Sequence, residues 1–168
     1  MGKMLKQLPK GSKGLTLLEI LLALLVAGIF LSLSLHLLIG YWRAAREVKD
    51  RLEIQYSLVT AGKTVSDAIR TAQSVQWVEQ ARVLKIRPGQ TGTSTDLYYI
   101  DDKDYDGVKD LYWEHLNVPN PVASSISAWS CKEVEPGLWQ VWLQATLGGQ
   151  QAQWEELIRQ RSGPVSSG

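Results

Sequence analysis

The chain has 168 residues, of which 18 are basic and 17 acidic, so its formal net charge is +1 at pH 7. This balance excludes a protein that holds nucleic acid through a general excess of positive charge. The single cysteine, Cys131, excludes an internal disulfide. With only two histidines, no phosphate-binding loop and no zinc spacing, the sequence contains no catalytic constellation, and we predict that the protein is not an enzyme.

The chain begins with a short basic segment. Residues 1–14 contain four lysines and no acidic residue, and they end in Gly14. A basic segment in front of an apolar stretch is typical of the cytoplasmic end of a targeting signal. We therefore interpret residues 1–14 as a leader peptide. Removing its four lysines leaves 14 basic against 17 acidic residues, a net charge of about −3.

An apolar stretch follows the leader. From Ile20 to Trp42 no residue carries a formal charge at neutral pH. As a helix, these roughly 23 residues would span about 35 Å, which is enough to cross a bilayer. Tyr41 and Trp42 stand at the far end, where aromatic residues commonly meet the membrane surface. We predict a transmembrane helix over residues 15–42.

Glu19 is an isolated carboxylate at the start of this apolar stretch. No basic residue follows it before Arg43. An unpaired carboxylate at the centre of a bilayer costs roughly 2.5 to 3.5 kcal/mol. The sequence therefore predicts that Glu19 has a cationic partner.

The segment Gly14-Leu15-Thr16-Leu17-Leu18-Glu19, after a basic leader and before an apolar run, resembles the processing site of type IV pilins and of type II secretion pseudopilins. The resemblance implies that a prepilin peptidase cleaves between Gly14 and Leu15 and N-methylates Leu15. It also implies that Glu19 is the family's assembly glutamate, which pairs with the α-amine of a neighbouring subunit's Leu15. Leu15 departs from the family, where phenylalanine is usual at this position.

The resemblance further implies a minor pilin or pseudopilin, a structural subunit of a type IV pilus-like or type II secretion filament. Its expected partners are the prepilin peptidase, other subunits and an inner-membrane assembly platform. The expected location is the cytoplasmic membrane, with the N-terminus inside and the head outside, and then the filament in the periplasm or at the cell surface. The alternatives are a filament-tip module with a surface- or DNA-binding head, although the net charge does not favour DNA, a membrane-anchored enzyme, and a secretory signal cleaved near Ala27 or Ser34.

Residues 43–73 continue the helical pattern but become amphipathic. Apolar residues recur at steps of three and four, which predicts a helix with one face buried against a sheet. This stripe comprises Ile54, Leu58, Ala61, Val65, Ile69 and Ala72. Gly28, Gly40 and Gly62 interrupt the long helix, and we interpret them as small residues that permit close packing, rather than as sites of local melting.

Residues 74–161 change to a strand pattern and predict an antiparallel sheet. Strands are expected over residues 75–78, 81–86, 97–100, 111–116 and 138–147, with a closing edge strand over 154–161. A long helix followed by an antiparallel sheet is an α+β architecture, and it is the pilin fold that the resemblance implies. The polar residues 162–168 predict a flexible tail.

A run of acidic residues lies between two of the expected strands. Asp102, Asp104 and Asp106, the carbonyl of Val108, and Asp110 fit the first nine positions of a calcium loop, and Gly107 would allow its sharp turn. The twelfth position is Trp113 instead of glutamate, so a helix-loop-helix EF-hand is excluded. Minor pilins that this chain resembles often carry a similar hairpin. The alternative is a solvated turn without metal, and no other cofactor is expected.

The head contains six of the seven tryptophans, at positions 77, 113, 129, 139, 142 and 154. Because most of them lie on expected strands, we assign them to the core or to a subunit interface, with a ligand-stacking platform as the alternative. His115, next to Glu114, predicts an exposed pair on a strand.

Overall fold

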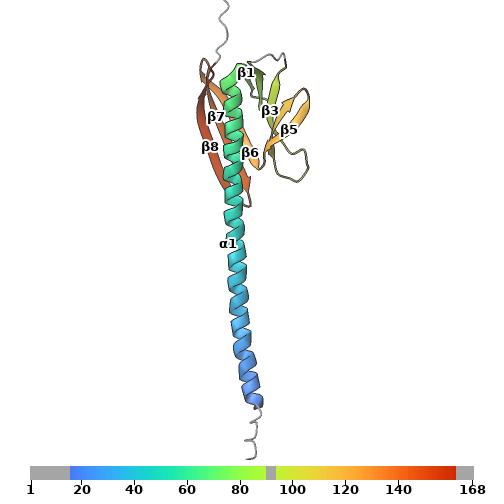
Figure 1. Ribbon diagram of the computed structural model, residues 1–168, viewed down its shortest axis with the longest axis vertical. Coiled ribbons are helices and arrows are strands. Elements are labelled where there is room, and N and C mark those ends of the chain that lie inside the picture. The colour runs from blue at the N-terminus through green and yellow to red at the C-terminus, as the bar shows by residue number, and fades with distance from the viewer. Residues whose placement is uncertain (1–15, 90–93, 162–168) are drawn as a thin grey trace, which may run out of the picture. The chain divides into compact units, whose positions relative to one another are not determined.

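The structure is a computed structural model that describes residues 16–89 and 94–161 (Figure 1). In the part of the chain that the structure describes, one helix, α1 (Leu17–Thr71), precedes all the strands. The chain divides into two compact units, Met1–Ala44 and Ala45–Gly168, so α1 contributes to both. The predicted α+β architecture, a long N-terminal helix followed by antiparallel strands, is confirmed.

In the first unit, the described chain consists of the N-terminal part of α1 and the residue before it. Every side chain from Thr16 to Ala44 is exposed, including large apolar ones such as Leu24 and Phe30. By length and composition this part of the helix could cross a membrane, and none of its most apolar window is buried. The core helix of a soluble protein would bury most of these side chains, so this one requires a different cover.

In the second unit, α1 buries one face, as its periodicity predicts. The buried residues of the helix are Ile54, Ser57, Leu58, Ala61, Gly62, Val65, Ser66 and Ile69. They include five of the six members of the predicted stripe, and the sixth, Ala72, is buried at the start of the first strand. The helix ends at Thr71, close to the predicted end at residue 73.

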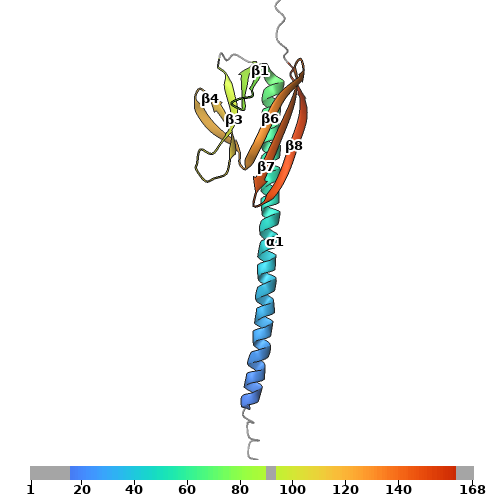
Figure 2. The ribbon, with the colours of Figure 1, turned by 180° about the vertical axis from the view of Figure 1, so that it is seen from behind.

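Within the described residues, eight antiparallel strands follow and form two sheets (Figures 1 and 2). The strands are β1 (Ala72–Val78), β2 (Val83–Pro88), β3 (Asp96–Asp101), β4 (Asp110–His115), β5 (Val118–Ala123), β6 (Ile126–Glu135), β7 (Leu138–Leu147) and β8 (Gln150–Arg159). The first sheet has the order β1-β2-β3-β4-β5 and the second the order β6-β7-β8. The strands of the head are therefore divided between two sheets, where the sequence pattern led us to expect one.

Two strands escaped the sequence prediction. β5 contains Pro119 and Pro121, which argue against a central strand because proline cannot donate to a ladder. The topology resolves the conflict, since β5 is the last strand of its sheet and pairs on one side only. β6 was missed because its alternation is weak, with four exposed residues at its end. β8 is a strand as expected, but it begins four residues earlier, at Gln150.

The core lies where both sheets meet the helix. Fully buried residues come from α1 and from both sheets, for example Val65, Leu84 and Leu143. Gly62 shows how closely the elements approach, because a Cβ atom at this position would lie 2.5 Å from Cε2 of Trp154 on β8. The glycines were expected to permit close packing between helices, but at Gly62 the close neighbour is a strand tryptophan. Among the described residues, no atom other than the helix's own nearby backbone lies within 4 Å of a Cβ added at Gly28 or Gly40.

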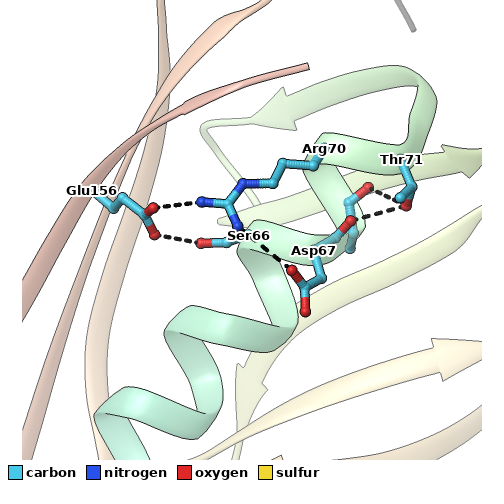
Figure 3. Close-up of polar contacts among 6 residues, drawn as sticks. Ser66, Asp67, Arg70, Thr71 and Glu156 are labelled. Atoms are coloured by element: carbon cyan, nitrogen blue, oxygen red, sulfur yellow. Dashed lines mark hydrogen bonds and ion pairs between the residues drawn. The ribbon is translucent and has the colours of Figure 1, made fainter. Parts of the chain in front are cut away.

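The C-terminal end of α1 is also tied to β8 by polar contacts (Figure 3). The Glu156 carboxylate accepts a hydrogen bond from Ser66 Oγ at 2.8 Å and another from Arg70 Nη2 at 2.7 Å. Asp67 lies 3.6 Å from Arg70 Nη1, so the guanidinium group faces two carboxylates. Charge-assisted contacts of this geometry orient the helix on the sheet as well as stabilising it.

Candidate functional site

The predicted cleavage junction, Gly14–Leu15, lies outside the described residues. Description of the N-terminal site therefore starts at Thr16, one residue before α1 begins.

Glu19 occupies the first turn of α1 and bonds to Thr16. Its Oε2 atom accepts hydrogen bonds from the Thr16 amide at 2.8 Å and from Thr16 Oγ1 at 3.1 Å. In return, the Glu19 amide donates to Thr16 Oγ1 at 3.3 Å. This reciprocal pattern is a capping box, which satisfies amides that the first helical turn leaves without partners. The Thr-x-x-Glu spacing is the sequence signature of a capping box, whereas only a cationic partner was predicted for Glu19.

Glu19 also lines a shallow hollow on α1, of about 560 Å³. The hollow is formed by Glu19, Leu22, Ala23, Val26, Ala27 and Phe30. The two alanines lie between larger side chains and leave the helix surface low, so another helix could approach closely there. The carboxylate thus stands at one end of an apolar surface suited to helix packing.

The acidic loop connects β3 and β4, and it brings three of the predicted ligands together. Carboxylate oxygens of Asp102, Asp104 and Asp106 all lie within 4.8 Å of one another. The loop is shaped by Gly107, which has φ +83° and donates its amide to Asp102 Oδ2 at 3.2 Å. A second turn bond joins the Val108 amide to Asp106 Oδ1 at 2.7 Å. The role predicted for the Val108 carbonyl stays a prediction.

One carboxylate oxygen of the loop is buried and is not used by the turn bonds. Asp102 Oδ1 is buried and has no hydrogen-bond partner among the described residues. Buried polar atoms are normally paired, and a carboxylate oxygen is a hard ligand of the kind that Ca²⁺ prefers. The donor set therefore fits a calcium ion, with Asp102, Asp104 and Asp106 as the residues that would hold it.

Asp110 does not join this group. It begins β4, and its Oδ1 accepts a hydrogen bond from the Ser125 amide at 3.1 Å. Burial raises the pKa of Asp110 above its usual value, the Ser125 bond opposes this rise, and the charges of Asp104, Asp106 and Asp102 add to it. Asp110 thus contributes to the electrostatics of the loop and holds the corner before β6.

The lysine within the acidic loop bonds to an aromatic pair instead of a carboxylate. Lys103 Nζ donates to the Tyr99 hydroxyl at 2.6 Å, and that hydroxyl donates to Glu114 Oε2 at 2.6 Å. The lysine also lies 4.9 Å from the centre of the Tyr99 ring and 5.5 Å from that of Tyr112. The spacing of these residues in the sequence does not predict this arrangement, because it depends on the register of β3 against β4.

The prediction for His115 was wrong. Its Nδ1 atom lies 2.6 Å from Oδ1 of Asp96, which is buried at the start of β3, while Glu114 accepts from Tyr99.

The assignment of the tryptophans to packing fits Trp129 and Trp139, which are buried in the core. Burial raises the pKa of the Cys131 thiol to about 12, so this cysteine is a packing residue.

Comparison of the chain with family models, with curated proteins and with solved structures found no match in any of the three.

Proposed function

We propose that the protein is a minor pilin or pseudopilin, anchored in the cytoplasmic membrane by residues 15–42 and assembled through that helix into a type IV pilus-like or type II secretion filament. The observation that carries the proposal is the exposed apolar part of α1, which has Glu19 in its first turn, five residues after the end of a basic leader. Residues 1–14 are the leader that a prepilin peptidase removes.

The exposed apolar helix supports this proposal because its surface must be shielded from water both before and after assembly. A bilayer would surround it before assembly, and the helices of neighbouring subunits would surround it afterwards. Its surface suits both, with large apolar side chains throughout and a low region at Ala23 and Ala27.

A second apolar surface on α1 supports assembly through the same helix. In the head, Val48, Leu52, Tyr56 and Val59 are all exposed and recur at steps of four, four and three. They lie on a different face from the buried Ile54 and Leu58. Apolar residues at helical spacing outside the core are suited to a partner helix.

The capping box gives Glu19 a defined state in the unassembled subunit. There Thr16 satisfies its carboxylate. In the filament, the α-amine of a neighbour's Leu15 would supply a positive charge to the same oxygens. Such a buried ion pair adds little net stability, but it selects one register of packing, because a misplaced subunit would leave the charge unpaired.

We also propose that the β3–β4 loop binds Ca²⁺ through Asp102, Asp104 and Asp106. Two observations favour this over a metal-free turn: the three carboxylates converge, and Asp102 Oδ1 is buried without a partner in the described part of the chain. Without a bidentate glutamate, an affinity of about 10⁻⁴ to 10⁻³ M is expected, as in extracellular modules. The ion would stabilise the hairpin.

The decisive experiment is intact mass spectrometry of the chain after co-expression with a prepilin peptidase. We expect loss of residues 1–14 and one added methyl group on Leu15. Gly14→Val should block cleavage, because in the family that this chain resembles the peptidase cuts after a glycine, whereas Gly11→Val is the matched control in the same leader and should be cleaved normally. An uncut leader in the unaltered chain, or cleavage after Ala27, would contradict the proposal.

A further inference from the structure

The three-stranded sheet, β6-β7-β8, has an inner face that packs on α1 and an outer face that points away from it. On the inner face, Trp154 lies against Gly62, and Glu156 binds Ser66 of the helix (Figure 3). Successive side chains of a strand point to opposite faces of its sheet. Every second residue of β7, beginning with the buried Trp139, therefore belongs to the inner face, and the residues between them belong to the outer face.

Trp142 stands at the centre of the outer face, midway along β7. The other five tryptophans of the head all have a place in its packing. Trp129 and Trp139 belong to the buried core, and Trp77, Trp113 and Trp154 pack against it. Trp142 does neither and is only partly buried. Its ring is therefore available to a ligand, as tryptophan often is at binding surfaces.

The side chains that surround Trp142 on the outer face are polar, and most of them carry no charge. Five of them lie directly opposite the tryptophan, two residues away along the same strand, or opposite one of those residues. They are Ser130 and Glu155, which lie opposite Trp142, Gln140 and Gln144, which precede and follow it on β7, and Gln153, which lies opposite Gln144.

These polar groups have hydrogen-bonding capacity left for a ligand. Gln140 Nε2 donates to Glu155 Oε1, which leaves the second carboxylate oxygen of Glu155 without a described partner. The side-chain amides of Gln144 and Gln153 bond to no other residue that the structure describes. A glutamine amide both donates and accepts hydrogen bonds, as a sugar hydroxyl does. The outer face therefore matches a ligand that is rich in hydroxyl groups.

Charge and apolar content argue against two other classes of ligand. Lys132, diagonal to Trp142, balances the charge of Glu155, so the face has no excess charge to hold a nucleic acid or another polyanion. The core of a protein interface is mostly apolar. Here the apolar neighbours of Trp142 are Ala128 and Leu157, both at diagonal positions. An aromatic ring among uncharged polar groups suits a neutral sugar better than a protein.

We propose that the outer face of the three-stranded sheet binds a neutral polysaccharide, one of whose sugar rings stacks on Trp142. The C–H groups on one face of a sugar ring are apolar and carry a partial positive charge, whereas the face of the indole carries a partial negative charge. Hydroxyl groups at the edge of the sugar form hydrogen bonds with Gln144, Gln153 and Glu155. The inference does not depend on the proposed function, because it concerns the head alone.

The test measures binding of the full chain to immobilised polysaccharides by surface plasmon resonance, in a detergent without a sugar headgroup. The neutral probes are dextran, mannan, galactan and chitohexaose, and heparin is the anionic comparison. We expect binding to at least one neutral probe and none to heparin. Because no ion pair is involved, the affinity should not change between about 50 and about 500 mM salt. Failure of all four neutral probes to bind would overturn the proposal.

Substitution of the tryptophan tests the stacking. Trp142→Ala should weaken binding to the neutral probe at least about tenfold, the scale on which aromatic stacking contributes to other ligands. Trp142→Phe keeps an aromatic ring and should lose less. Melting temperatures measured in parallel show whether each variant is folded. Unaltered affinity of a folded Trp142→Ala chain would contradict the proposal.

Two glutamines of the outer face test the hydrogen bonds and do not depend on how the tryptophan variants fold. The double substitution of Gln144→Ala with Gln153→Ala should weaken binding several-fold. Gln76→Ala is the matched control, because Gln76 is an exposed glutamine on β1 of the other sheet, and it should bind normally. Equal affinities of the two variants would overturn the proposal. So would a face that binds no sugar but loses another filament subunit when Trp142 is replaced, since that result assigns the face to a protein.

Discussion

The two units of the chain use one helix in opposite ways. From Thr16 to Ala44 every side chain of the described chain is exposed, whereas from Ile54 to Ile69 the same helix buries eight residues against two sheets. Both parts are rich in apolar residues. The two parts differ in how the apolar residues are distributed. In the first part they surround the helix, so no face is suited to water; in the second part they form a stripe, so the opposite face can remain in solvent. The first part must be covered by something other than its own unit, whereas the second part is covered by the two sheets of the head.

The largest expected effect comes from a substitution in the first part of the helix, which should impair assembly without changing the head. Glu19→Ala should reduce incorporation into filaments more than about a hundredfold, since leaving one partner of a buried ion pair alone costs about 3 to 5 kcal/mol. The melting temperature of the head should not change. Glu47→Ala, also an exposed glutamate of α1, is the control. Immunoblotting of sheared filaments measures incorporation, and normal incorporation of the Glu19 variant would refute the assembly role.

The same type of substitution should act in opposite ways in the two units. Gly62→Ala places a methyl group against the Trp154 ring and should destabilise the head by about 1 to 3 kcal/mol. Gly40→Ala places its methyl group more than 4 Å from every described atom outside the helix's own nearby backbone, and it should stabilise the helix by up to about 1 kcal/mol. Chemical denaturation followed by tryptophan fluorescence gives both values. Equal effects at the two sites would mean that Trp154 does not pack on Gly62.

Calcium should act on the second unit only. With an affinity near 10⁻³ M, 10 mM Ca²⁺ should stabilise the head by about 1.4 kcal/mol, and Asp104→Asn should remove most of this gain. Asp101→Asn is the control, since Asp101 precedes the three grouped carboxylates and is not among them. Differential scanning calorimetry with Ca²⁺ and with Mg²⁺ measures the shift. A chain whose melting temperature is unaffected by millimolar Ca²⁺ lacks the site.

The smallest effect concerns Asp110. Because its pKa is raised in the folded state, the folded protein binds the proton more tightly than the unfolded chain, and stability falls as the pH rises from about 3.8 through the folded pKa. Asp110→Asn should therefore slightly stabilise the calcium-free protein at neutral pH, while its amide oxygen still accepts from Ser125. The gain should disappear below pH 3.8. Urea denaturation at several pH values tests this, and a gain that persists in acid would rule out the pKa as its cause.

The predictions that came true depended on local patterns. The buried stripe from Ile54 to Ile69 follows from helical spacing, and the grouping of Asp102, Asp104 and Asp106 follows from a short loop between two strands. The bond between His115 and Asp96 could not be predicted, because 19 residues separate them and only the register of β3 against β4 brings them together. β5 was missed because its prolines are tolerated only at the end of a sheet, which its sequence does not reveal.

The sequence by itself determined the apolar helix, its isolated glutamate, the α+β class and the acidic turn, because each depends on residues close together in the chain. Only the tertiary structure decided that the strands form two sheets and that Gly62 makes room for Trp154. These features depend on which distant segments pack together. Packing is selected by the fit of many side chains at once, and no local pattern encodes that fit.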